Sequence, residues 1–253
     1  MTGTAVGRRT AGVVLSLAIL AGCGTAGSHS TSSAAPPAIT ADRAVPASIA
    51  DLPLTDQHEA TTSLAAYRGK VLVLAPFLTS CQEECPLTTG AFLVIESDLR
   101  RAGLAHRVAL AELTVDPERD TPARLAAYGT YTGADWSLLT GTSSVIRAFW
   151  AHFGIFYSPT PESSPPGIDW QTHRPYTYDV AHSNGFIIFD TQGHQRYLTE
   201  TLPNLHGRIP PALRRLLVGA GIHNLDHPDP TGAWTIPEAL KAIGDVLGQN
   251  IPG

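Results

Sequence analysis

Two cysteines one helical turn apart stand out among the residues of this 253-residue chain. Cys81 and Cys85 lie in Thr-Ser-Cys-Gln-Glu-Glu-Cys-Pro, at the end of an apolar run. Residues four positions apart share one face of a helix and are separated by a rise of about 6 Å. That span lies within the roughly 4.4 to 6.8 Å between Cα atoms that a disulfide tolerates. The two sulfurs can therefore bond to each other or converge on a single ion.

The start of a helix places two opposing electrostatic effects on this pair. Backbone N–H groups and the macrodipole at a helix N-terminus favour a thiolate, so at least one thiol should ionise more readily than a free cysteine. Glu83 and Glu84, between the two cysteines, act in the opposite direction. The sequence alone leaves open which effect dominates.

A distant histidine completes a candidate metal site. His182 lies in Asp-Val-Ala-His-Ser-Asn-Gly, directly before a predicted hairpin strand. Thiolates select Cu(I), Zn(II) or iron–sulfur centres, and an imidazole extends this range to Cu(II). Two sulfurs and one nitrogen suit three-coordinate Cu(I) but are incomplete for structural zinc. The alternatives are an inert disulfide in an exported protein and a histidine that only caps a loop.

The other histidines are not assigned to a site. His173 lies in a proline-rich segment and is predicted to be a surface residue. His223 and His227 are four positions apart, but Pro228 and the neighbouring acidic residues favour a turn. We therefore expect both of these side chains to be solvated.

The elements that must position Cys81, Cys85 and His182 follow from apolar periodicity. The near-continuous apolar run 71–77 predicts a strand buried on both faces. Helical spacing after Pro86 predicts a helix that begins at the second cysteine and stops near Gly103. Asp120 and Thr121 are expected to cap the next helix. The remaining predicted elements are a strand at 107–115, helices at 122–128 and 143–154, a hairpin at 185–199, and helices from 211 and at 237–247.

This order of elements predicts the fold class. Alternating strands and helices favour an α/β sheet covered on both faces. A βαβ unit followed by a ββα unit, with cysteines where the first strand meets the first helix, is the thioredoxin-like arrangement. We therefore predict a thioredoxin-like α/β fold with a central mixed sheet flanked by helices. A proline-rich insertion loop at 157–178 and a C-terminal helical extension lie outside that plan.

The N-terminus has the pattern of an export signal. Arg8 and Arg9 precede an uncharged stretch of 12 residues, 11–22, which is too short to span a bilayer. The small residues before Cys23 resemble the lipobox of bacterial lipoproteins, in which the cysteine is acylated after cleavage. A plain secretory signal is the alternative. The expected organisation is a signal peptide at 1–22, a flexible tether with lipidated Cys23 at 23–48, a thioredoxin-like domain at 49–220 and an extension at 221–253.

Charge and export together indicate where the protein works. Cleavage before Cys23 would remove two arginines and no acids, which changes the formal charge from −5 to −7. A mildly acidic surface argues against nucleic acid as a partner. We expect a lipid-anchored protein on the extracytoplasmic face of the cell membrane.

Five segments come in the order and spacing of the Sco/SenC family, which the chain resembles over roughly residues 50 to 220. The most specific are Cys-x3-Cys-Pro and Val-Asp-Pro-Glu-Arg-Asp-Thr-Pro. The five segments lie at 64–70, 79–86, 114–122, 136–141 and 181–185. The resemblance implies a thioredoxin-like, membrane-anchored copper chaperone for the binuclear copper centre of cytochrome c oxidase.

The resemblance also implies ligands and partners. Cys81, Cys85 and His182 match the three metal ligands of the family, for Cu(I) or Cu(II). The implied partners are the oxidase subunit that carries the binuclear site, and a copper donor or thiol reductant. Two positions depart from the pattern, because many members have proline where this chain has Gln82 and aspartate where it has Ala181. Loss of that carboxylate predicts weaker copper retention, by an amount that can reach about 10 to 100-fold.

Two enzymatic functions compete with copper binding. In a thiol–disulfide oxidoreductase, one of Cys81 and Cys85 attacks a target disulfide and the other resolves it, with no role for His182. A thiol peroxidase would use Thr79 near Cys81, but it needs a basic residue beside the thiolate. The local sequence offers two glutamates instead.

Overall fold

The computed structural model describes residues 1–3 and 39–252. From residue 39 onward the chain folds as one compact unit around an eight-stranded sheet with the order β1-β10-β9-β4-β5-β6-β2-β3. The strands of this sheet are β1 (Ile39–Ala44), β2 (Leu54–Asp56), β3 (Thr61–Thr62), β4 (Val71–Phe77), β5 (Val108–Thr114), β6 (Ser137–Thr140), β9 (Phe186–Phe189) and β10 (His194–Thr199). The helices are α1 (Ala47–Ala50), the 3-10 helix η1 (Leu64–Tyr67), α2 (Cys85–Arg101), α3 (Pro122–Thr132), α4 (Ser143–Phe153), α5 (Pro211–Arg214), α6 (Gly219–Asp226) and α7 (Ile236–Leu247).

The sheet is mixed, and its centre carries the cysteine loop. β4 pairs in parallel with β5, and β5 with β6, through connections that contain α2 and α3. β9 and β10 form the predicted hairpin and join the other side of β4 in antiparallel pairing. All seven residues of β4 are buried, as its apolar sequence requires for a strand covered on both faces. The predicted thioredoxin-like α/β fold is confirmed.

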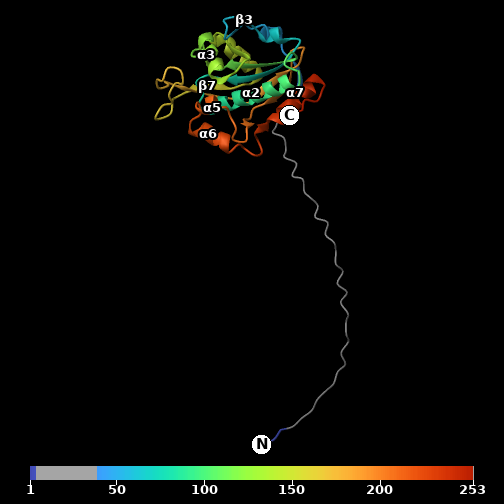
Figure 1. Cartoon of the computed structure of the whole chain (residues 1–253), viewed down its shortest axis with the longest axis vertical. Helices are drawn as coiled ribbons and strands as arrows, with labels where there is room; N and C mark the ends of the chain where they lie inside the picture. Colours follow the sequence, from blue (N-terminus) through green and yellow to red (C-terminus); the bar gives the residue numbers. More distant parts are fainter. Residues whose placement is uncertain (4–38, 253) are drawn as a thin grey trace. The chain divides into compact units, whose positions relative to one another are not determined.

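Helices cover the sheet and fill its core. Figure 1 shows α2 and α7 side by side over the sheet, and α7 also contacts β4 and β9. α4 contributes the fully buried rings of Phe149 and Trp150, and Phe153 packs edge-on against Phe189 of β9 at 5.4 Å between ring centroids. α2 begins at Cys85, with Pro86 in its first turn, where a missing N–H costs nothing. The second cysteine is thus held at the helix start, as predicted.

The N-terminal edge of the domain differs from the sequence prediction. The expected tether reached residue 48, but 39–44 form β1, which pairs antiparallel with β10, and α1 follows at 47–50. The tether prediction is therefore wrong from residue 39 onward. Most of β1 is exposed, so this edge strand lacks the apolar alternation that would reveal it.

The remaining N-terminal predictions concern Cys23 and residues 4–38, which lie outside the described part of the chain. Among the helices of residues 39–252, none combines the length and apolar character needed to cross a membrane.

The proline-rich insertion, called the ribbon, is a loop closed at its base by two paired strands. Strand β7 (Tyr157–Thr160) lies at its start and pairs antiparallel with β8 (Asp179–His182), which directly follows the insertion, in a separate two-stranded sheet. The segment between them projects from the domain at the left of Figure 1. The prediction of a loop at 157–178 thus missed a strand at its start, and the partner strand carries His182.

The C-terminal extension is part of the domain core. The helix predicted from Pro211 is only one turn long, and the expected boundary at residue 220 falls inside α6, which is a correction to the predicted organisation. Beyond it, β12 (Trp234–Thr235) pairs in parallel with β11 (Pro203–Asn204). The fully buried Trp234 packs edge-on against Phe186 of β9, at 4.9 Å between ring centroids.

Candidate metal centre

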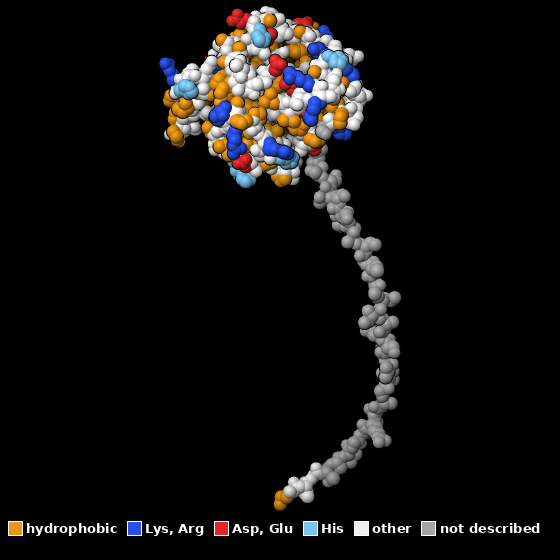
Figure 2. Space-filling view, in the orientation of Figure 1, with side chains coloured by type: hydrophobic (Ala, Val, Ile, Leu, Met, Phe, Trp, Pro, Cys, Tyr) orange, Lys and Arg blue, Asp and Glu red, His pale blue; other side chains and the backbone are white. Residues whose placement is uncertain are grey.

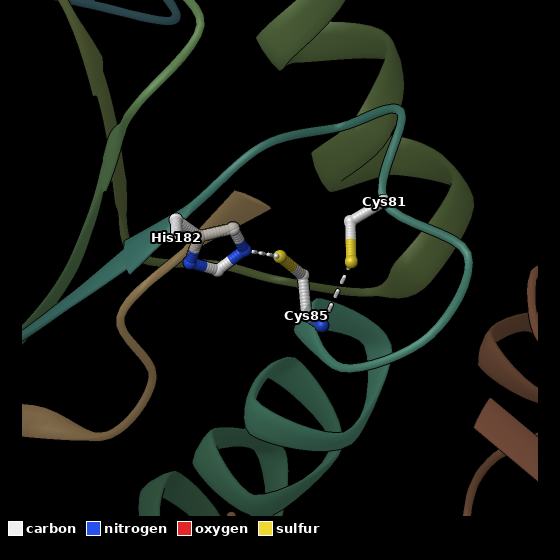
Figure 3. Close-up of side chains that lie close together, drawn as sticks. All are labelled: Cys81, Cys85 and His182. Carbon is white, nitrogen blue, oxygen red and sulfur yellow. Dashed lines mark hydrogen bonds between the residues drawn. The ribbon is translucent and has the colours of Figure 1, made fainter. Parts of the chain in front are cut away.

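Cys81, Cys85 and His182 meet at the N-terminus of α2. Each offers one ligand atom, and the three atoms lie within 4.8 Å of one another. Cys81 comes from the loop after β4, Cys85 is the first residue of α2, and His182 is the last residue of β8 (Figure 3). The structure therefore brings together the three side chains that the sequence singled out, although Cys85 and His182 are 97 positions apart in the chain.

Cys81 is the sulfur best prepared to carry a negative charge. The backbone N–H groups of Glu84 and Cys85 donate to its Sγ at 3.4 and 3.3 Å, as expected at a helix N-terminus. A hydrogen bond from the Cys85 thiol, helped by His182, holds the pKa of Cys81 well below its usual value, although burial opposes this. The question left open by the sequence is thereby answered, since these donors outweigh Glu83 and Glu84.

Cys85 is the protonated partner of the pair. Its side chain is buried, at 2% exposure. Burial, followed by the adjacent Cys81 sulfur, raises the pKa of Cys85 well above its usual value. Burial and the charge of Cys81 also raise the pKa of Glu83 and of Glu84. Cys81 is therefore the more acidic thiol of the pair.

His182 presents a defined nitrogen to the sulfurs. Its Nδ1 lies 2.7 Å from the backbone oxygen of Ser183, which can only accept, so Nδ1 carries a hydrogen. In the neutral ring the lone pair is then on Nε2, which lies 3.4 Å from Sγ of Cys85. Burial acts to lower the pKa of His182, but the hydrogen bond to Cys81 and its charge raise it. A negative charge on Cys81 and a proton on His182 therefore favour each other.

A buried carboxylate fixes the loop that carries Cys81. Asp120 accepts from the backbone N–H and the hydroxyl of Thr79, and from the hydroxyl of Thr114 at 2.6 Å. Burial raises the pKa of Asp120 to about 6 in spite of these donors. We expected Asp120 to cap α3, which is wrong; Thr121 caps it, by accepting from the N–H of Arg124 at 3.3 Å. The motif around Asp120 signalled importance, but the sequence could not show this long-range contact.

The C-terminal extension supports the same loop. The N–H of Val218 donates to the backbone oxygen of Gln82 at 2.9 Å. At Gly221 of α6, an added Cβ would lie 2.7 to 2.8 Å from backbone atoms of Gln82 and Glu83. The side-chain amide of Gln82 donates to the oxygen of Ile168 in the ribbon at 3.1 Å. None of these supports was predicted from the sequence.

A basic residue also reaches the loop. Arg124 of α3 donates from Nε to the Thr79 hydroxyl, so the structure supplies the cation that the local sequence lacked for peroxidase chemistry. Its guanidinium is already paired with Asp169 at 2.9 Å and lies 3.8 Å from Asp120. Arg124 is therefore neutralised within a structural network that holds Thr79.

The other candidate histidines lie away from this centre. His173 is exposed, as predicted. His223 and His227 are exposed, as predicted. The predicted turn is wrong for His223, which lies within α6, whereas His227 lies at the bend that ends the helix, and its N–H donates to the oxygen of His223 at 2.8 Å.

A second group of metal-capable side chains, formed by Asp42, Asp190 and His194, is explained by hydrogen bonding. Asp190 accepts from the backbone N–H of His194 and from Arg196, which closes the β9–β10 turn. Nδ1 of His194 lies 2.8 Å from Asp42 on β1. These contacts attach the N-terminal strand to the hairpin.

The donor set at the α2 N-terminus fits a soft cation. Two sulfurs and one imidazole nitrogen match the ligand preference of Cu(I), while Cu(II) is reached through the imidazole. A Zn(II) site of the structural kind would need a fourth protein ligand. Binding would replace the thiol proton of Cys85 and any proton on Nε2 of His182, since only the deprotonated forms are ligands.

Comparisons with known proteins find similar sequences. The family model described as SCO1/SenC matches residues 41–207. The chain is 26% identical over 155 residues to a putative copper-binding protein of Stutzerimonas stutzeri, covering 61% of this chain and 68% of that one. It is 25% identical over 130 residues to an SCO2-like protein of Rickettsia felis, covering 51% of this chain and 62%, less than two thirds, of that relative.

Solved structures support the fold. ScoI of Bradyrhizobium japonicum with copper bound aligns with a TM-score of 0.50 at 21% identity, covering 65% of this chain and 93% of that one. A SCO1/SenC family lipoprotein of Bacillus anthracis aligns with the same TM-score and identity, covering 72% and 97%. The family match ends at residue 207, so α5, α6 and α7 lie beyond it.

Proposed function

Because the chain belongs to the SCO1/SenC family, we propose that it is a copper-binding metallochaperone that delivers copper to the binuclear centre of cytochrome c oxidase during assembly. The observation that carries the proposal is the convergence of Cys81, Cys85 and His182, with the lone pair of neutral His182 directed toward the sulfurs. Copper is the cargo of this site, held as Cu(I) or Cu(II).

Delivery proceeds by ligand exchange. Cys81 is partly exposed while Cys85 is buried, so an incoming thiolate of the recipient subunit reaches the Cys81 side of the ion first. Displacement of the two sulfurs one at a time keeps the ion coordinated throughout. A copper donor, or a reductant of the thiols, would use the same face. The export signal and Cys23 support a lipid-anchored position on the extracytoplasmic face of the membrane.

A metal titration tests the proposal. The reduced domain from residue 39 onward is titrated with Cu(I) under a competing chelator, alongside Cys81→Ser, Cys85→Ser and His182→Ala, with exposed His173→Ala as the matched control. We expect one Cu(I) per chain for the wild type and for the control. Loss of one of three ligands should weaken binding by at least roughly tenfold. Unchanged affinity in all three variants would refute copper binding at this site.

A thiol–disulfide oxidoreductase is the second candidate, because the pKa of Cys81 is lowered well below that of Cys85. A thiolate beside a buried thiol is the arrangement of an attacking and a resolving cysteine. The two functions separate at His182. If His182→Ala retains full affinity for Cu(I) and Cu(II), and reduction of a disulfide substrate requires both cysteines, the oxidoreductase is favoured.

A further inference from the structure

Two histidines of the C-terminal extension form a second ligand pair. His223 lies on α6 and His227 is the residue that follows its last turn; their ring centroids are 4.9 Å apart with the planes inclined by 51°. The backbone hydrogen bond from His227 to His223 keeps both on one face of the helix. Histidines at i and i+4 of a helix are a recurring metal-binding arrangement, because both imidazoles can reach one ion.

The surroundings of the pair favour a cation. Both rings line a cavity of about 350 Å³, together with the carboxylates of Glu200 and Asp229 and the amides of Asn184 and Asn224. Among the described residues that line it there is no lysine or arginine. Hydrogen bonds from the backbone and side chain of Thr231 lower the pKa of Asp229, which keeps this carboxylate ionised. In Figure 2 histidine, acidic and basic side chains lie close together at the domain edge over α6, where Arg214 is paired with Asp226 at 3.9 Å.

We infer that His223 and His227 form a second cation site, for a divalent ion of the imidazole-preferring class that includes Cu(II) and Zn(II). The two ring nitrogens are the protein ligands, and water completes the coordination beside Glu200 and Asp229. This donor set has nitrogen and oxygen but no sulfur, so it prefers Cu(II) where the cysteine centre prefers Cu(I). The inference does not depend on the proposed function, because none of its residues belongs to the cysteine centre.

The second site is close to the first in the fold. Asn184, which lines the cavity, is two residues from His182, and its side chain hydrogen-bonds Glu84. On the other side, Gly221 of α6 lies against the backbone of Gln82 and Glu83. An ion at the histidine pair is therefore held beside the loop that carries Cys81, on a helix that lies outside the family match.

Removal of the first site isolates the second one. A background variant of the domain carries Cys81→Ser, Cys85→Ser and His182→Ala and is titrated with Cu(II) alone by equilibrium dialysis. Into this background we place His223→Gln, His227→Gln, or His173→Gln as a matched control at another exposed histidine. Electron paramagnetic resonance of the bound Cu(II) reports whether imidazole nitrogens are coordinated.

The inference predicts one Cu(II) per chain in the background, with a nitrogen signature. Glutamine at either position 223 or position 227 should weaken Cu(II) binding by roughly tenfold or more, because a second ligand on the same ion acts at high effective concentration. His173→Gln should change nothing. Absence of bound Cu(II) in the background, or equal affinity in all variants, would overturn the inference. Neither result bears on Cu(I) binding by the cysteine centre, which is tested separately.

Discussion

Gln82 and Ala181 are the two side chains beside the metal centre that depart from the family pattern, and their contacts explain how the site accommodates them. Gln82 links two segments, since its amide bonds Ile168 of the ribbon and its backbone oxygen accepts from Val218 of the extension. Ala181 is exposed, whereas its neighbour His182 turns toward the sulfurs. The Ser183 oxygen orients the imidazole, so orientation does not require a carboxylate at position 181.

A buried glutamate beneath the centre is the least expected residue of the core. Glu112 of β5 has 0% exposure and accepts from the hydroxyl of Thr89 at 2.8 Å and from the indole of Trp136 at 3.0 Å. Burial raises its pKa to about 7, although both hydrogen bonds oppose the shift. The negative charge of Glu112 also contributes to raising the pKa of Cys85, so protonation of Glu112 removes that contribution.

Glu112 should make stability depend on pH. Its pKa of about 7 in the folded protein lies above the reference value of 4.5. The stabilisation that Glu112 contributes to the free energy of unfolding is therefore complete below about pH 4.5 and is lost as the pH rises through 7. The loss corresponds to about 3 kcal/mol. In Glu112→Gln this loss is absent. The free energy of unfolding of the variant, relative to that of the wild type, should therefore be about 3 kcal/mol higher at pH 8 than at pH 4. Urea unfolding of both reduced proteins at the two pH values measures this.

The comparison at pH 4 serves as the internal control for that prediction. Protonated glutamate and glutamine have nearly the same shape. Each can accept from the Trp136 indole with one oxygen and donate from the other arm to the Thr89 hydroxyl, so the two proteins should be similar in stability there. Asp120, whose pKa is raised to about 6, titrates in both proteins and cancels in the difference. A stability difference that is equal at pH 4 and pH 8 would contradict the proposed titration of Glu112.

The helices and strands with a strong apolar periodicity were predicted from the sequence. The continuous run of β4, the helical spacing of α2 and the hairpin of β9 and β10 are dictated by burial, and each is present. The three ligand candidates were found because their residue types are chemically distinctive. Short or exposed strands were not predicted. β1, β7 and β8 are examples, because they pair through the backbone and carry little apolar pattern.

The supports of the site could not be predicted because they join distant segments. Asp120 reaches Thr79 across 41 positions, and Trp170 donates from Nε1 to the Thr79 oxygen across 91. α6 contains two glycines and lacks a strong apolar stripe, so no helix was predicted there, and Pro228 with the neighbouring acids favoured a turn around His223 and His227. Its close approach to the cysteine loop depends on a missing side chain at Gly221, which no local pattern reveals.

That close approach can be tested with two glycines of the same helix. At Gly221 an added methyl group would meet backbone atoms of Glu83 at 2.7 Å, whereas at Gly219 no heavy atom lies within 4 Å. Gly221→Ala should lower the free energy of unfolding by about 1 to 3 kcal/mol and weaken Cu(I) binding, because the loop bearing Cys81 must move. Gly219→Ala should be neutral or stabilise by up to about 1 kcal/mol through helix propensity. Urea unfolding and Cu(I) competition measure both effects, and equal behaviour of the two variants would contradict the contact.

For the whole molecule, the extension beyond residue 207 completes the domain. α7 lies against α2, β4 and β9, and thus covers the centre of the sheet. Trp234 donates from its indole to the Thr201 oxygen at 2.9 Å and packs on Phe186. Leu240 and Ile243 are fully buried as well. The segment that lies outside the family match is therefore part of the hydrophobic core of the metal-binding domain.

Deletion of residues 208–253 should consequently abolish folding. Burying each large apolar side chain contributes about 1.5 to 3 kcal/mol, and the deletion removes Leu213, Trp234, Leu240 and Ile243, all at 0% exposure. Their combined loss rivals the whole stability of a typical domain, about 5 to 15 kcal/mol. We expect the truncated chain to lose near-ultraviolet circular dichroism and its cooperative thermal transition, while deletion of 1–38 preserves both. A truncated chain that still melts cooperatively and binds Cu(I) would show that the extension is an accessory, and that the sheet face under α7 tolerates water.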